Sequence, residues 1–92
     1  MYNRSSDPII TNSIFSNNNA TSYGGGVYTS AFNSPQVINS TFYNNNAGIN
    51  GGGMYNNSSP PSLTSVTFSE NKAYSTGGGM FNTSSSPVLT DV

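Results

Sequence analysis

The chain has 92 residues, of which 33% are hydrophobic, and it contains no Trp, no Cys and no His. This composition leaves little material for a compact globular core, and it excludes disulfides, thiolate metal sites and histidine chemistry. The two basic and three acidic side chains, Arg4, Lys72, Asp7, Glu70 and Asp91, supply no basic patch for nucleic acid, and no apolar run approaches the ~20 residues that span a bilayer. We therefore expect no nucleic-acid partner, no membrane-spanning segment and no cofactor.

The sequence repeats itself along its whole length. Its units are Met1–Gly26, Val27–Gly53, Met54–Gly79 and a half unit Met80–Val92, with 26, 27, 26 and 13 residues. The one extra residue of the second unit lies between Val27 and Pro35, where we expect a surface loop that tolerates a length change. A period of this size with glycine and proline punctuation indicates a solenoid, so residues 1–92 are predicted to form a single solenoid segment.

Each unit opens with an aliphatic and an aromatic residue, which follow a triple glycine in every unit but the first, as in Gly24–Gly26 and Val27-Tyr28. We predict a strand over Gly25–Thr29 and its equivalents. A proline follows, and after it a second strand is predicted over Ile9–Phe15 and its equivalents, with turns at the Ser- and Asn-rich stretches. No stretch keeps apolar residues at helical spacing. The prediction is therefore an all-β fold with two or three strands in each coil.

In a parallel β-helix, equivalent residues of successive coils lie one above another at roughly 4.8 Å, the spacing of paired strands. Phenylalanines can stack in such a column, and asparagine amides can hydrogen-bond along the axis. We call each such column a ladder and interpret these ones as internal packing and turn formation. Three ladders are predicted: Phe15, Phe42, Phe68; Asn18, Asn45, Asn71; and Ile10, Val37, Leu63, Leu89.

Two motifs of the repeat resemble those of the bacterial polymorphic outer-membrane-protein repeats, which carry a GGA[ILV]-type segment and an FxxN segment. The first appears here with Gly in place of the usual Ala, as in Gly25-Gly26-Val27, and the second appears as Phe15–Asn18 and its equivalents. The resemblance covers the whole chain. It implies a right-handed parallel β-helix on a secreted or surface-anchored protein, often an adhesive one.

One ladder is a candidate contact surface. Neighbouring residues of a strand face opposite sides, so the aliphatic row and the aromatic row that open the units cannot both point inward. We expect the aliphatic row in the core and the aromatic row outside. An exposed aromatic stripe can stack on sugar rings or pack against another solenoid, whereas the alternative is a lateral hydrophobic cluster covered by a loop. The stripe consists of Tyr2, Tyr28, Tyr55 and Phe81.

The charged residues do not suggest an active site. Many β-helical enzymes cleave polysaccharides with paired carboxylates, or with a basic residue beside carboxylate-bound calcium. Here Asp91 and Glu70 belong to different ladders, and we expect Arg4 with Asp7, and Glu70 with Lys72, to form weak surface ion pairs. The chain is thus predicted not to be an enzyme, with no catalytic and no metal residues.

The leading functional prediction is a structural or adhesive extracellular solenoid, a rod or filament at the cell surface. The alternative is a fragment of a β-helical polysaccharide lyase or hydrolase, or a carbohydrate-binding module. Met1 occupies the position of Met54 and Met80, and the half unit makes direct head-to-tail stacking of copies strained. We therefore expect a segment of a longer protein whose partners are flanking coils, further copies bound laterally or axially, and surface glycans.

Overall fold

The structure is a computed structural model that describes residues 1–31 and 33–92. Within these residues it contains strands and turns and no helix, which confirms the all-β prediction. The strands are β1 (Tyr2–Arg4), β2 (Ile9–Thr11), β3 (Ile14–Ser16), β4 (Asn19–Ala20), β5 (Val27–Ser30), β6 (Gln36–Ile38), β7 (Thr41–Tyr43), β8 (Asn46–Ala47), β9 (Met54–Asn57), β10 (Ser62–Thr64), β11 (Thr67–Ser69), β12 (Lys72–Ala73), β13 (Met80–Thr83) and β14 (Val88–Thr90).

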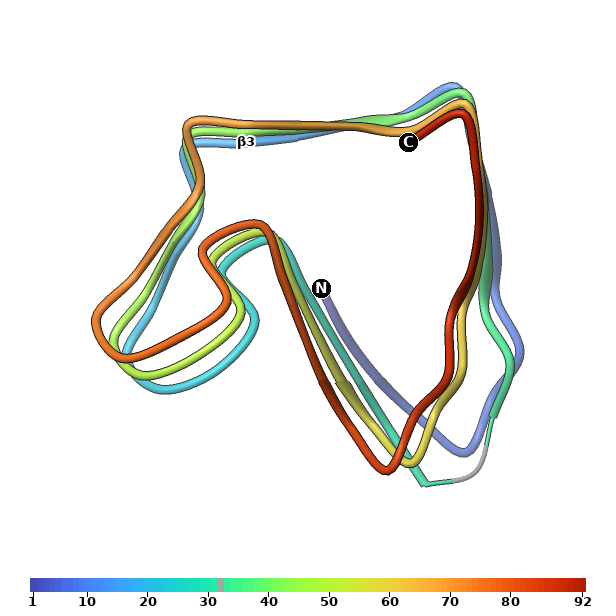
Figure 1. Cartoon of the computed structure of the whole chain (residues 1–92), viewed down its shortest axis with the longest axis horizontal. Coiled ribbons are helices and arrows are strands. Elements are labelled where there is room, and N and C mark those ends of the chain that lie inside the picture. The colour runs from blue at the N-terminus through green and yellow to red at the C-terminus, as the bar shows by residue number, and fades with distance from the viewer. Residues whose placement is uncertain (32) are drawn as a thin grey trace.

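The strands stack into four parallel sheets that form the walls of a solenoid (Figure 1). Sheet A contains β1, β5, β9 and β13, sheet B contains β2, β6, β10 and β14, sheet C contains β3, β7 and β11, and sheet D contains β4, β8 and β12. In Figure 1 the chain turns counter-clockwise while it advances toward the viewer, so the solenoid is right-handed. The coils superpose in this view, whose direction is the 18 Å dimension of the molecule.

Each coil has more corners than the sequence pattern predicted. The segment Ile9–Phe15, predicted as one strand, is divided into β2 and β3 at Asn12, which has a φ of 50°. The strand predicted over Gly25–Thr29 begins at Val27 and ends at Ser30. A complete coil therefore has four strands instead of two or three, because one left-handed residue between two short extended runs turns the chain without interrupting either run.

Left-handed residues form a ladder at every corner. Asparagine, which tolerates this conformation better than most residues, supplies several of them, and glycine fills the corner between sheets D and A. Ala31 and Glu70 lack this tolerance and adopt φ values of 72° and 54°, because the corner geometry of neighbouring coils dictates theirs. The ladders are Ser5, Ala31, Ser58, Ser84; Asn12, Asn39, Ser65, Asp91; Asn17, Asn44, Glu70; and Gly24, Gly51, Gly77.

The second and third glycines of the first two triples lie where backbones of adjacent coils approach closely. A Cβ atom built on Gly25 would lie 2.4 Å from the Gly52 carbonyl oxygen. At Gly52 the corresponding distance to the Lys72 carbonyl oxygen is 2.2 Å. No larger residue fits these distances, which explains why the triplet recurs with the coil.

The hydrophobic core fills the space between the sheets. Val27 and Met54 point into it from sheet A, and Val37 and Leu63 do so from sheet B. The Phe ladder enters from sheet C, with ring centroids 4.9 Å apart between Phe15 and Phe42 and 4.8 Å apart between Phe42 and Phe68. Phe42 is completely buried, whereas its two neighbours, each with one coil beside it, are partly exposed. In the aliphatic ladder of sheet B, Leu89 is likewise half-exposed in the last strand.

Buried asparagines join the coils along the axis. The Asn45 side-chain amide donates to the Asn71 Oδ1 atom (3.0 Å) and to the Phe15 carbonyl (2.8 Å). Its Oδ1 atom accepts from the backbone and the side chain of Asn18. Every polar atom of the Asn45 side chain therefore has a partner, as a buried amide requires. The FxxN spacing places Asn45 and Asn71 beside the carbonyl of the phenylalanine in the preceding coil.

A second polar ladder lies inside sheet A and was not among the three that were predicted. The Thr29 hydroxyl donates to the Asn56 Oδ1 atom (2.6 Å), and the Asn56 amide donates to Asn82 (2.8 Å). Thr29 and Asn56 are completely buried. Three of its four members, Asn3, Asn56 and Asn82, are identical and only Thr29 departs, so the ladder recurs at the repeat period.

The extra residue of the second unit lies at the corner between sheets A and B. Arg4 pairs with Ser30 one coil away, and the spacing of paired residues grows by one before Ile9 pairs with Gln36. Between the second and third coils, the spacing of paired residues has the shorter value again where Gln36 pairs with Ser62. The insertion therefore falls between Ser30 and Gln36, a segment that includes position 32, which lies outside the described residues.

The Phe ladder allows a direct test of the core. Phe42→Ala empties a position with a ring above and a ring below, so it should lower the free energy of unfolding by about 3–5 kcal/mol. Phe15→Ala is the matched control, and it should cost less because Phe15 has a ring on one side only. Denaturant unfolding followed by circular dichroism measures both. A cost below about 1 kcal/mol for Phe42→Ala would show that the ring is not in the core.

Candidate functional site

The aromatic stripe lies on the outer face of sheet A. Ring centroids are 5.0 Å apart for Tyr2 and Tyr28, 5.1 Å for Tyr28 and Tyr55, and 5.4 Å for Tyr55 and Phe81. The three pairs are stacked, with interplanar angles between 10° and 21°. The aliphatic neighbours Val27 and Met54 point inward with no exposed surface, so the strand alternation places the rings outside the core.

Tyr23 covers the middle of this stripe. It belongs to the loop that joins sheet D to sheet A, and its ring centroid lies 4.6 Å from that of Tyr55 and 6.3 Å from that of Tyr28. Tyr55 is consequently only 8% exposed, whereas Tyr2 is 65% exposed. At Tyr55 the stripe therefore forms the covered cluster that was the alternative prediction. At Tyr2 it is an open surface.

Sequence comparison within the repeat could not identify Tyr23 as part of the site. Its equivalents in the next coils are Asn50 and Thr76, and isolated β-bridges join Tyr23 to Asn50 and Asn50 to Thr76. These two side chains hydrogen-bond to each other, with the Thr76 hydroxyl donating to the Asn50 Oδ1 atom (2.8 Å). Tyr23 therefore belongs to no aromatic ladder, and its position directly before Gly24 was the only available signal.

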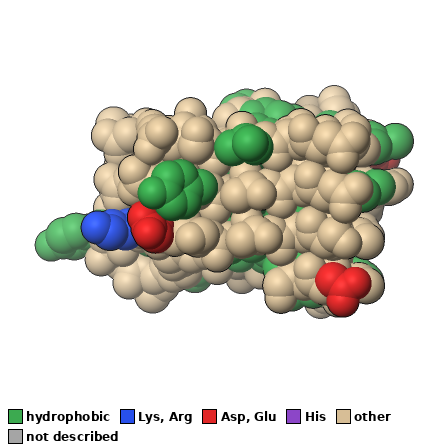
Figure 2. Space-filling model, turned by 90° about the horizontal axis from the view of Figure 1, so that it is seen from above, with side chains coloured by type: hydrophobic (Ala, Val, Ile, Leu, Met, Phe, Trp, Pro, Cys, Tyr) green, Lys and Arg blue, Asp and Glu red, His purple; other side chains and the backbone are tan. Residues whose placement is uncertain are grey.

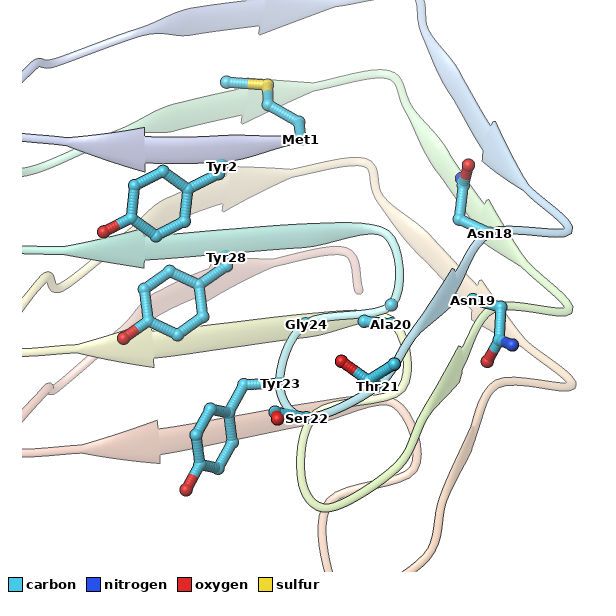
Figure 3. Close-up of a pocket in the computed structure, with 11 residues that line it drawn as sticks. Met1, Tyr2, Asn18, Asn19, Ala20, Thr21, Ser22, Tyr23, Gly24 and Tyr28 are labelled. Carbon is cyan, nitrogen blue, oxygen red and sulfur yellow. The ribbon is translucent and has the colours of Figure 1, made fainter.

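The stacking limits what the stripe can bind. An aromatic platform for a sugar needs an exposed ring face, but stacked rings cover the faces of their neighbours. Figure 3 shows Tyr2 and Tyr28 in parallel with their hydroxyls toward the same side, and Tyr23 continuing the row from the loop. The lateral surface of the stripe thus consists of ring edges and phenol hydroxyls. It is suited to hydrogen bonds and side-by-side packing instead of face stacking on sugars.

An open hollow adjoins the first rings of the stripe (Figure 3). Tyr2, Tyr23 and Tyr28 border one side, and the segment from Asn18 to Gly25 borders the other. The terminal amine of Met1 donates to the Gly26 carbonyl (2.7 Å), as the Met54 amide does to Gly79. Met1 thus occupies its expected position in the repeat, and burial lowers the pKa of its amine.

In the described part of the chain, the acidic and basic side chains do not gather into one site. Glu70 and Asp91 lie at different corners, and no group of three or more acidic, His or Cys side chains is found there. The expected ion pairs of Arg4 with Asp7 and of Glu70 with Lys72 do not form among the described residues, where no oppositely charged atoms lie within 4.0 Å. Asp7 instead accepts a hydrogen bond from the Ser34 amide (2.7 Å), so its carboxylate is held on the neighbouring coil.

Few charges are available on the surface that Figure 2 shows, where polar side chains and backbone dominate and hydrophobic side chains are scattered. The described residues include no helix with the length and hydrophobicity needed to cross a membrane. The face shown in Figure 2 therefore offers mainly neutral polar groups with separate hydrophobic side chains among them.

Two segments of the chain match a known family of repeats. Residues 12–30 and 65–79 match the Chlamydia polymorphic membrane protein repeat. The chain is similar to this repeat family. The matched segments contain Phe15 with Asn18 and Phe68 with Asn71, the motifs on which the resemblance was based, so the resemblance is confirmed. The searches of curated proteins and of solved structures gave no significant match.

The covered position of Tyr55 predicts an alkaline weakness. Burial, and then the neighbouring phenols of Tyr28 and Tyr23, raise the pKa of Tyr55 above its ordinary value. In the unfolded chain Tyr55 loses its proton near pH 10. The raised pKa of Tyr55 therefore does not change the stability of the fold below about pH 10. It lowers the stability as the pH rises from there toward the pKa of the folded state.

Denaturant unfolding between pH 8 and pH 11.5 measures this loss. Tyr55→Phe removes the titrating group and keeps the ring, so the variant should lose less stability across this range than the unmodified chain. Tyr74→Phe is the control, because Tyr74 is 90% exposed and lies outside the stripe. Equal losses in the chain and in the Tyr55→Phe variant would contradict the assignment.

Proposed function

We propose that this chain is a structural segment of a surface-exposed β-solenoid protein, which serves as a stiff rod or spacer and not as an enzyme. The observation that carries the proposal is the continuity of its axial bonding. Backbone hydrogen bonds link each coil to the next at the corners as well as in the sheets, as between Gly25 and Gly51 and between Asn39 and Thr64. Such a chain has few places at which it can bend.

The similarity to the Chlamydia polymorphic membrane protein repeat supports a place at the cell surface. The outer surface also supports it, because neutral polar side chains remain hydrated in any salt and at any physiological pH. Five charged groups give a net charge of −1, so the module exerts little electrostatic influence on what surrounds it. An adhesive role would then rest on shape, aromatic edges and hydrogen bonds.

The same features favour association with further solenoid surface. In the isolated segment the outermost strands of each sheet, such as β1 and β13 of sheet A, are paired on one side only and have open edges. Open edges and low charge promote association. We propose that the partners are flanking coils and other solenoids, and that the exposed end of the aromatic stripe at Tyr2 supplies a lateral contact.

Light scattering of the isolated chain tests this association, with circular dichroism as the check on folding. The chain should self-associate as its concentration rises, and electron microscopy should show elongated particles. Tyr2→Ser should reduce lateral bundling, while Tyr74→Ser, which removes an equally large exposed ring elsewhere, should not. Tyr55→Ser is unsuitable as a probe because that ring is covered.

Two results would contradict this association. A chain that remains a cooperatively folded monomer at high concentration would refute association through open edges. Bundling that falls equally in Tyr2→Ser and Tyr74→Ser would refute the stripe as the specific contact.

A further inference from the structure

A second hollow lies on the outer face of sheet A, beyond the aromatic stripe and toward the corner with sheet B. It has a volume of about 370 Å³ and is lined by Tyr2, Arg4, Tyr28, Ser30, Ala31, Asn57 and Ser58. Strand register explains this grouping, because Arg4 pairs with Ser30 and Ser30 pairs with Asn57. Three coils therefore present one row of polar side chains beside two aromatic rings.

Arg4 is the only positive side chain at this hollow, and it is exposed there. Its guanidinium has no ion-pair partner within 4.0 Å among the described residues. The nearest acid in sequence, Asp7, is held by the Ser34 amide. The five N–H donors of Arg4 are thus available to a planar anion, which a guanidinium binds in a bidentate manner.

The remaining lining groups are neutral. Ser30, Asn57 and Ser58 contribute hydroxyl and amide groups, and the stacked rings of Tyr2 and Tyr28 contribute their edges and hydroxyls. A polyanion such as nucleic acid requires several cations along its path, and the chain contains only two. One cation among hydroxyl and amide groups is suited to a ligand with one carboxylate and several hydroxyls.

We propose that this hollow binds an acidic saccharide, with a uronate carboxylate on Arg4 and sugar hydroxyls on Ser30, Asn57 and Ser58. This surface has room for one or two sugar rings lying along the polar row. The contact is lateral and uses ring edges, because Tyr2 and Tyr55 cover the two faces of the Tyr28 ring. The site would give the solenoid a charge-selective contact with acidic glycans, beyond its role as a rod.

Saturation-transfer-difference NMR with trigalacturonic acid tests the site, and maltotriose serves as the neutral trisaccharide. Trigalacturonic acid should give a transfer signal that weakens between 0.01 M and 0.15 M NaCl, because an exposed ion pair is screened. Maltotriose should give a much weaker signal. Arg4→Gln should reduce affinity about tenfold, as expected when a charge-assisted pair is lost.

Lys72→Gln is the matched control, because it removes the other cation of the chain, which lies on sheet D. It should leave affinity within about twofold if binding is local and does not depend on net charge. Equal losses in Arg4→Gln and Lys72→Gln would overturn the proposal. Equal binding of triglutamate and trigalacturonic acid would overturn the saccharide assignment, and circular dichroism of each variant excludes misfolding as the cause of a loss.

Discussion

The structure depends on one constraint: every residue must tolerate an equivalent residue one strand spacing away along the axis. Phenylalanine meets it by stacking, with Phe42 between two rings at 4.9 Å and 4.8 Å. Asparagine meets it by hydrogen bonding through Asn45, and glycine meets it by leaving room for a carbonyl. A conventional core is unnecessary in such a fold, because burial and hydrogen bonding are distributed along columns instead of concentrated at a centre.

The same constraint shapes the outer surface. Side chains that face outward are also stacked, so the aromatic stripe presents ring edges and Arg4 stands at the end of a row with Ser30 and Asn57. A ligand of this surface would therefore meet rows of side chains that run parallel to the axis. Where the sequence departs from the repeat, the rows acquire individual features: Tyr23 covers Tyr55, and Arg4 supplies a single charge.

Sequence alone predicted the parallel solenoid, because triple glycines, prolines and the FxxN motif recur at the coil period and identity between units exposes them. It could not predict features that lack identity. The left-handed residue Asn12 divides an expected strand. This corner was not predicted, because its ladder mixes Asn, Ser and Asp. The covering residue Tyr23 was missed for the same reason. The inner ladder was not predicted although Asn3, Asn56 and Asn82 recur in it with the coil period.

Native-state hydrogen exchange tests the axial account most directly. If stability arises from contacts between neighbouring coils, amides of the second coil should exchange more slowly than those of the first coil in all four sheets, because the second coil has a paired strand on both sides in every sheet. Val37, Phe42 and Ala47 then exchange more slowly than Ile10, Phe15 and Ala20. Exchange rates that differ by sheet and not by coil would contradict the account, since they would place the stability in individual walls instead of in the stack.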